Sequence, residues 1–254
     1  MPADPRPRYA QIADELGRRI DAGTLGPGML IPSDSELCEE FDVARNTARQ
    51  ALDLLRTRGL IYTVKGRGSL VRPRRKPKRL GGARYRADVE STPERPQTSV
   101  THDMGIRFEE HNPDRVISRE DATPEVAELF RVPEGTPLVR RDLVFRFEGW
   151  PTHMSTSYYL ADMVEGTWVA GPGSEPAPGG AIGHLKSLGV VVDKVVETVE
   201  SRMPTAREAE VLRMSAGPVL AITRQMLAAG RVVEVAREIV YPGDGVRLEY
   251  EIPL

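Results

Sequence analysis

The chain of 254 residues has little of several features that would decide its class at once. It has one cysteine, Cys38, and so cannot form an intrachain disulfide framework. It contains no run of eighteen apolar residues, and its start, from Met1 to Arg8, holds three prolines and two arginines with no apolar segment behind them. We therefore expect a cytoplasmic protein with no membrane partner, in which Cys38 is a buried thiol.

Motifs for catalysis and for cofactor binding are also missing. No nucleophile elbow or phosphate-binding loop is present, and metal-ligand spacing is absent among the four histidines, His102, His111, His153 and His184. We therefore expect no metal, no cofactor and no enzyme activity. Each histidine is expected to be structural or solvated.

Charge is distributed unevenly, although the formal net charge is only -2. Residues 1–71 hold 10 basic and 10 acidic side chains, residues 72–86 hold 8 basic and no acidic ones, and residues 87–254 hold 17 basic and 27 acidic ones. A basic segment beside a neutral module favours a polyanionic partner, which the acidic remainder would repel. The first third of the chain is therefore the part suited to nucleic acid.

The spacing of apolar residues predicts three helices and a hairpin in this first third. Apolar residues four apart predict a helix over residues 8–22, and a Ser-x-x-Glu capping box at Ser33 begins a second helix. A third helix ends at Gly59, and two short strands over 60–64 and 69–71 follow it. This order is that of a winged helix-turn-helix, whose last helix enters the major groove of DNA.

The polar face of the third helix and the basic hairpin tip carry the candidate DNA contacts. Arginine can donate two bonds to guanine, asparagine can pair with adenine, and basic residues at a glycine-rich tip can neutralise phosphates. The expected contacts are Arg45, Asn46, Thr47, Arg49 and Gln50 on the helix and Lys65, Gly66 and Arg67 at the tip. As alternatives, the polar face is simply solvated, or Arg49 is held in a salt bridge by Asp53 four residues later.

Residues 8–71 resemble the DNA-binding domain of the GntR family of bacterial regulators. The resemblance is carried by YAQIA from Tyr9, ARNTARQAL from Ala44 and GRGSLV from Gly66. It implies that the DNA-contact positions are Arg45, Thr47, Arg49 and Gly66. The chain departs from the family pattern at Ala44, where a small hydroxyl residue is usual, and at Ser35, where an arginine often contacts DNA.

The remainder of the chain predicts an α+β domain built on an antiparallel sheet. Residues 87–115 are rich in proline, threonine and charge and cannot be assigned. From there the pattern predicts a short helix after Thr123, a hairpin of strands 138–147 and 152–159, a helix over 181–188, a strand over 190–199, a capped helix at Thr205, and strands over 219–228, 232–241 and 246–252. Strands paired in hairpins and mixed with helices indicate this fold class.

Polar residues in these strands are the candidates for a ligand pocket. Alternation along a strand sends Arg140 and Arg141 to opposite faces, so at most one faces a given pocket, and either could form a rim salt bridge instead. An arginine there would bind a carboxylate or phosphate through its planar fork. Tyr158 fits either the pocket or a plain core. Glu234, with Arg237 in the same strand, lies among valines and needs a partner or a ligand donor.

Residues 123–254 resemble the UTRA domain, the ligand-binding domain that defines the HutC subfamily of GntR regulators. The matching strings, in order, include PEGTPLVRR from Pro133, GGAIGHL from Gly179, RMPTAREA from Arg202 and IVYPGD from Ile239. The resemblance implies a fold shared with chorismate lyase and a pocket lined by the arginine strand, a Ser-Tyr segment and the Val-Glu strand. Tyr241, within the last string, completes the candidate effector contacts.

These observations together predict a two-domain regulator. We expect a winged helix-turn-helix domain over 1–72, a basic linker over 73–95 and an effector-binding and dimerisation domain over 96–254. The predicted function is that of a homodimeric transcription regulator, a repressor, whose affinity for double-stranded operator DNA is controlled by a small-molecule effector, possibly anionic. The alternatives are a constitutive DNA-binding protein without an effector and an enzyme of chorismate-lyase-like fold.

Overall fold

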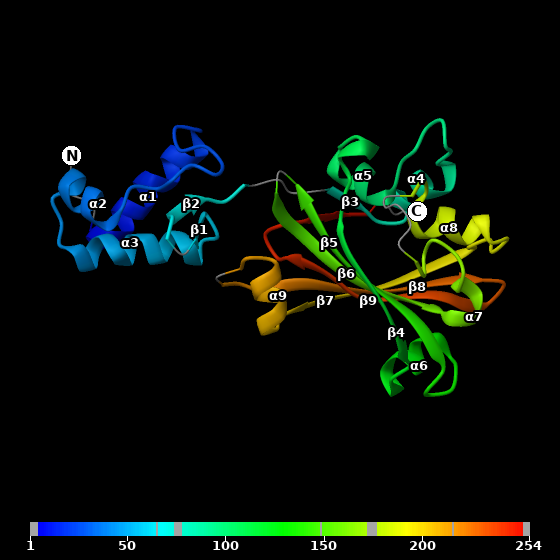
Figure 1. The fold of residues 1–254 in the computed structure, drawn as a ribbon. Coiled ribbons are helices and arrows are strands. Elements are labelled where there is room, and N and C mark those ends of the chain that lie inside the picture. The colour runs from blue at the N-terminus through cyan, green and yellow to red at the C-terminus, as the bar shows by residue number, and fades with distance from the viewer. Residues whose placement is uncertain are drawn as a thin grey trace. The chain divides into compact units, whose positions relative to one another are not determined.

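The computed structural model describes residues 5–64, 66–73, 78–147, 149–171, 177–214 and 216–250. Within these residues the chain forms two compact units, one made by residues 5–73 together with the described part of 205–217, and one made by the described parts of 78–204 and 218–250 (Figure 1). The first unit is mainly helical and the second is built on an antiparallel sheet, so the predicted α+β class is confirmed. None of the helices in the described ranges is long and apolar enough to cross a membrane.

The first unit contains the three predicted helices and the predicted hairpin. Its elements are α1 (Arg8–Asp21), α2 (Asp34–Phe41), α3 (Arg45–Thr57), β1 (Ile61–Val64) and β2 (Gly68–Val71). The capping box at Ser33 is complete, because its hydroxyl accepts from the amide of Glu36 while the Glu36 carboxylate accepts from the amide of Ser33. Asp42 adopts a left-handed backbone with φ of 51° and ends α2, which produces the turn before α3.

One apolar core holds this unit together. Its helical part comes from Ile12, Leu16 and Leu37 and from the predicted inner face of α3, where Leu52 and Leu55 are buried. The β1–β2 hairpin closes against the same core through buried residues of both strands. Since this core takes one face of α3, the opposite face of the helix is left to the surface.

The second unit is a six-stranded antiparallel sheet with helices on both faces. The strands are β4 (Asp114–Asp121), β5 (Pro137–Phe147), β6 (Trp150–Leu160), β7 (Lys194–Arg202), β8 (Val219–Ala228) and β9 (Arg231–Pro242), in the spatial order β4-β5-β6-β9-β8-β7. One face is covered by α4 (Arg84–Glu90), α5 (Ser99–Met104) and α8 (Gly180–Ser187), and the other packs against α6 (Pro124–Phe130) (Figure 1). The remaining short elements of this unit are η1 (Phe108–Glu110) and α7 (Ala161–Val164), whereas α9 (Ala206–Val211) is grouped with the first unit.

The structure corrects the expected linker over 73–95 and assigns the segment that the sequence left open. Residues 74–77 lie outside the described residues, but Lys78–Leu80 form a strand, β3, and α4 follows within the second unit. Arg84 on α4 is only 2% exposed, and it forms an ion pair with Asp103 of α5. The basic segment therefore ends in folded structure, because a buried carboxylate from outside the segment holds one of its arginines.

The last predicted strand also differs from the expectation. Of the predicted strand 246–252, residues Arg247–Glu249 form β10, and residues 251–252 lie outside the described residues. The strand β10 pairs in parallel with β3 instead of joining the main sheet. By contrast, β8 has the predicted bounds, and β9 extends one residue beyond its prediction at each end. The capped helix expected at Thr205 is α9, and its capping box is complete.

Candidate functional sites

The outer face of α3 presents the predicted base-reading side chains to the surface. Arg45, Asn46, Arg49 and Gln50 are exposed, and Thr47 is half-buried. Ala44, which precedes the first residue of α3, has no side-chain oxygen to accept a hydrogen bond from the free amides of the first turn. The outer face of α3 therefore carries many hydrogen-bond donors.

A single carboxylate from α2 lies near both arginines of this face. Asp34 is 3.8 Å from Nε of Arg45 and 3.7 Å from Nε of Arg49, whose side chains are 70% and 60% exposed. Such exposed ion pairs contribute little free energy, so DNA phosphates or bases can replace Asp34. The alternative in which Asp53 holds Arg49 is wrong, because Asp53 pairs with Arg56 one turn further along α3.

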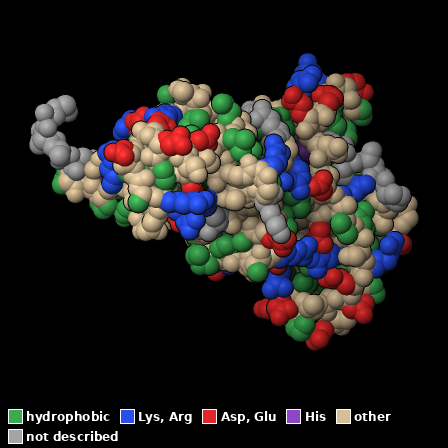
Figure 2. Space-filling model, turned by 60° about the vertical axis from the view of Figure 1, so that its left-hand side comes forward, with side chains coloured by type: hydrophobic (Ala, Val, Ile, Leu, Met, Phe, Trp, Pro, Cys, Tyr) green, Lys and Arg blue, Asp and Glu red, His purple; other side chains and the backbone are tan. Residues whose placement is uncertain are grey.

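The hairpin tip beside α3 is formed by glycines in a left-handed conformation. Gly66 has a φ of 79°, and a Cβ atom added there would meet nothing within 4 Å. Arg67 is exposed next to it, whereas Lys65, also predicted to contact DNA, lies outside the described residues. Among the described residues that Figure 2 shows, basic and acidic side chains are interspersed.

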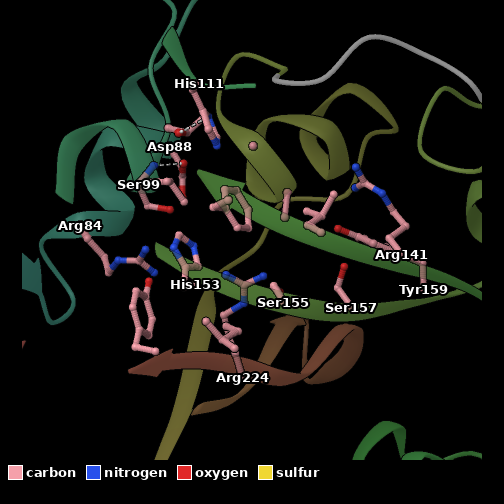
Figure 3. Close-up of a pocket in the computed structure, with 18 residues that line it drawn as sticks. Arg84, Asp88, Ser99, His111, Arg141, His153, Ser155, Ser157, Tyr159 and Arg224 are labelled. Carbon is pink, nitrogen blue, oxygen red and sulfur yellow. Dashed lines mark hydrogen bonds between the residues drawn. The ribbon is translucent and has the colours of Figure 1, made fainter. Parts of the chain in front are cut away.

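The second unit contains a cavity between its sheet and the helices above it. The floor is one face of the sheet, where Arg141 and Phe145 of β5, Ser157 and Tyr159 of β6 and Arg224 of β8 line the cavity (Figure 3). The roof comes from α4, from the start of α5 and from the start of α8. Residues far apart in the sequence thus meet around one cavity.

Three arginines line this cavity, and two of them are held in buried ion pairs. Arg84 binds Asp103 at 2.7 Å, and Arg224 binds Glu234 at 2.6 and 3.2 Å through two of its nitrogens. Burial opposes the charge on Arg224, yet Glu234 beside it raises the pKa of that guanidinium well above its usual value. Arg141, 4% exposed, lies over the rings of Tyr159 and Trp168, and burial lowers its pKa.

The register of the sheet places Arg141 and Arg224 in one row. Arg141 pairs with Ser157, Ser157 with Ala236, and Ala236 with Arg224, so that two small residues separate the arginines across four strands. Neighbouring strands are about 4.8 Å apart, which puts their Cα atoms roughly 14 Å from each other. Two long cationic side chains therefore flank a floor of small residues, as a site for a small polar ligand requires.

The structure places some of the six predicted effector contacts in the cavity lining and the others elsewhere. Arg141 and Tyr241 line the cavity. Arg140 faces the opposite side of the sheet, where it pairs with Asp142 and lies over the ring of Tyr158, which belongs to the core under α6. Arg237 is exposed on β9. Glu234 is completely buried behind Arg224 and is not among the lining residues.

Several residues of the cavity were not predicted as site residues. They are Arg84, Asp88, His111, His153, Tyr159 and Arg224. Tyr159 is offset by one position from the predicted Tyr158, and it is the tyrosine that shares a face with Arg141. Asp88 is 4% exposed and accepts a hydrogen bond from the amide of Ser99 at 2.7 Å, and its burial raises its pKa to about 6.

Neither site has the composition of a metal centre. Among the described residues, no group of three or more His, Cys, Asp or Glu side chains is arranged to hold a metal ion. His111 and His184 are buried, and burial lowers the pKa of each to about 4, so both are uncharged at neutral pH. A donor-rich helix face and an arginine-lined cavity define, as a class, a DNA-binding protein that carries a ligand-binding domain.

Comparison with known proteins agrees with this class and gives the family. Residues 8–71 match the model of the bacterial regulatory proteins of the gntR family, and residues 115–247 match the UTRA domain. The chain belongs to the GntR family of transcriptional regulators, of the type that carries a UTRA domain. It is therefore a DNA-binding transcriptional regulator with an effector-binding domain, and the resemblances seen in the sequence are confirmed.

Individual relatives cover most of the chain. An uncharacterized HTH-type transcriptional regulator of Streptomyces coelicolor is 31% identical over 215 residues, which is 83% of this chain and 79% of the relative. The HTH-type transcriptional repressor NagR of Bacillus subtilis is 29% identical over 246 residues, 94% of this chain and 92% of NagR. A GntR-family regulator of known structure aligns with a TM-score of 0.55 at 27% identity and covers 98% of both chains.

Proposed function

We propose that the chain is an effector-controlled repressor that acts in the cytoplasm as a homodimer on palindromic operator DNA. The observation that carries the proposal is the buried guanidinium of Arg141 in the lining of a cavity, in the same chain as an exposed polar face on α3. A buried guanidinium is suited to a carboxylate or phosphate of a ligand. NagR, which matches nearly the whole chain, is named as a repressor, and this supports repression rather than activation.

The reading of DNA is assigned to the α3 face and to the hairpin tip. In the proposal Arg45, Asn46, Arg49 and Gln50 approach base edges, Thr47 and the tip residues Lys65, Gly66 and Arg67 approach phosphates, and Asp34 gives up its weak contacts. Two such helices related by a twofold axis would read two half-sites one helical turn of DNA, or a multiple of it, apart.

Control by the effector requires a difference in affinity. The ligand must bind one arrangement of the two domains better than the other, since a ligand with equal affinity for both shifts nothing. The proposal assigns the second unit to ligand binding without turnover, because the matched relatives are regulators. Arg141 and Tyr241 are its proposed contacts among the predicted residues, and Glu234 acts by holding Arg224.

A nuclease footprint on the DNA upstream of the protein's own gene tests this function. We expect two protected half-sites with twofold symmetry, a dimer mass in solution by sedimentation, and reduced transcription from that DNA in a purified system. Protection without symmetry, from a protein that sediments as a monomer, would refute the dimeric arrangement. Increased transcription would refute repression.

A further inference from the structure

Arg56 lies on the outer face of α3, near the end of the helix. It follows Arg45 by eleven residues and Arg49 by seven, so a rotation of about 100° per residue places it within about 20° of both around the helix axis. Its side chain is 26% exposed, whereas those of Arg45 and Arg49 are 70% and 60% exposed. Arg56 is therefore turned towards the protein, on the side where the β1–β2 hairpin follows α3 (Figure 1).

Each nitrogen of the Arg56 guanidinium donates a hydrogen bond to a different side chain. Nε donates to Oγ1 of Thr63 on β1 at 2.9 Å, one terminal nitrogen donates to Oγ of Ser69 on β2 at 3.1 Å, and the other donates to the carboxylate of Asp53 on α3. Thr63 and Ser69 are opposite each other in the hairpin, and their hydroxyl oxygens are 3.2 Å apart. A planar guanidinium can hold both strands and the helix at once, whereas the single nitrogen of lysine cannot reproduce this geometry.

These contacts hold the hairpin closer to its tip than the apolar core does. The core includes Ile61 and Val71, which pair at the base of the hairpin. The pair of Thr63 and Ser69 lies two residues further along each strand, and the tip lies three residues beyond Thr63, about 10 Å along the strand. A backbone hydrogen bond from Ile31 attaches β2 to the segment before α2, whereas the guanidinium attaches both strands to α3.

Direct contact with a DNA phosphate is the alternative role for Arg56. It would require the guanidinium to give up its hydrogen bonds to both strands, and its charge is already compensated by Asp53. The contacts of Asp34 with Arg45 and Arg49 are longer, at 3.7–3.8 Å, and join exposed side chains. The geometry therefore favours a role for Arg56 inside the protein over a contact with DNA.

We infer that Arg56 is a positioning residue for DNA binding, which fixes the hairpin tip relative to the outer face of α3. The inference rests on the proposed function, which assigns DNA contacts to both the helix face and the tip. Side chains that bind together require support from neighbouring hydrogen bonds to hold their relative positions, and the guanidinium of Arg56 supplies that support here.

Two variants that keep every charge test this role. Arg56→Lys replaces the planar fork by one nitrogen, and Thr63→Val with Ser69→Ala removes the two acceptors of the hairpin. Fluorescence anisotropy with the protected upstream DNA at constant salt should show at least about a fivefold loss of affinity in each. The matched control is Arg58→Lys, directly after α3, where the side chain pairs with Asp14 and the change should be less than about twofold. A loss below about twofold in either test variant would overturn the inference.

A double-mutant cycle with the tip decides whether Arg56 acts through the hairpin. In a chain with Lys65→Ala and Arg67→Ala, which lacks the basic side chains of the tip, Arg56→Lys should weaken binding by less than about twofold further. In the Arg49→Ala chain it should retain its full effect, because Arg49 belongs to the helix face. An undiminished loss in the tip variant would overturn the inference, since Arg56 would then act on DNA without the hairpin.

Amide hydrogen exchange in the free protein separates failure of the inference from failure of the proposed function. Arg56→Lys should speed exchange of the amide of Arg67, which donates to the carbonyl of Val64 at 3.0 Å, at least about threefold and leave the middle of α3 unchanged. Unchanged exchange at Arg67 would overturn the inference. If exchange rises there but Arg49→Ala and the tip variant bind the upstream DNA as tightly as the unaltered chain, the proposed DNA contacts fail while the attachment of the hairpin by Arg56 stands.

Discussion

Removal of Glu234 should destabilise the second unit far more than removal of both members of its ion pair. Glu234 is fully buried, its partner Arg224 is 12% exposed, and two hydrogen bonds of 2.6 and 3.2 Å join them. Glu234→Ala leaves a buried guanidinium without that carboxylate, which costs about 3–5 kcal/mol. The double variant Arg224→Met with Glu234→Leu removes both charges and should retain most of the stability of the unaltered chain.

The two tryptophans of the chain make this prediction measurable in the intact protein. Trp150 and Trp168 both lie in the sheet-containing unit, so their fluorescence in a urea titration reports the unfolding of that unit alone. Glu234→Gln, which keeps the volume and one acceptor, should lie between Glu234→Ala and the unaltered chain. A loss below about 1 kcal/mol for Glu234→Ala would refute its role as the partner of Arg224.

Three further substitutions, the last with a matched control, test local features of the structure. The pKa of Asp88 is raised in the folded chain to about 6 from an ordinary value of 3.8, so stability is lost as the pH rises through this range. Asp88→Asn removes this loss and should therefore raise the free energy of unfolding by about 1–3 kcal/mol at pH 7.5. Urea titrations should show the gain vanish towards pH 4. Ala44→Ser should supply the missing cap of α3 and slow amide hydrogen exchange in its first turns, corresponding to about 1 kcal/mol, and unchanged exchange would contradict this reading. Gly183→Ala places a Cβ atom 2.2 Å from the carbonyl oxygen of Pro178 and should lower stability by about 1–3 kcal/mol. Gly17→Ala in α1, with its nearest neighbour at 3.7 Å, should be neutral or stabilising by up to about 1 kcal/mol. Calorimetric melting in which Gly183→Ala is as stable as the unaltered chain would contradict the packing at α8.

Much of the first unit could be predicted because its signals are local. The capping box at Ser33, the apolar face of α3 and the glycines at the hairpin tip each lie within a few residues of the structure that they determine. The polar face of α3 followed from the same spacing, since a helix buries one side only. The contact of Asp34 with Arg45 and Arg49 could not be predicted from the sequence, because it joins two helices.

The effector cavity was predicted less completely because its residues depend on long-range pairing. Alternation showed that only one of Arg140 and Arg141 could face a pocket, but the strand register was needed to identify Arg141 and to replace Tyr158 by Tyr159. The partner of Glu234 lies ten residues earlier on a neighbouring strand and is visible only once β8 and β9 are paired. The parts of the roof from α4 and α5 lie in segments that were taken as linker or left unassigned, since their composition resembles that of an extended chain, whereas the helix α8 was predicted.

The exposed face of α3 is proposed to read DNA, and the affinities of two variants for the protected upstream DNA test this role. Fluorescence anisotropy at constant salt should show a loss of about five- to one-hundred-fold for Arg49→Ala, which removes one base-reading side chain. Arg18→Ala on α1 removes the same charge from a side chain that pairs with Glu15 and should change the affinity less than about threefold. Equal affinities for Arg49→Ala and the unaltered protein would contradict the claim.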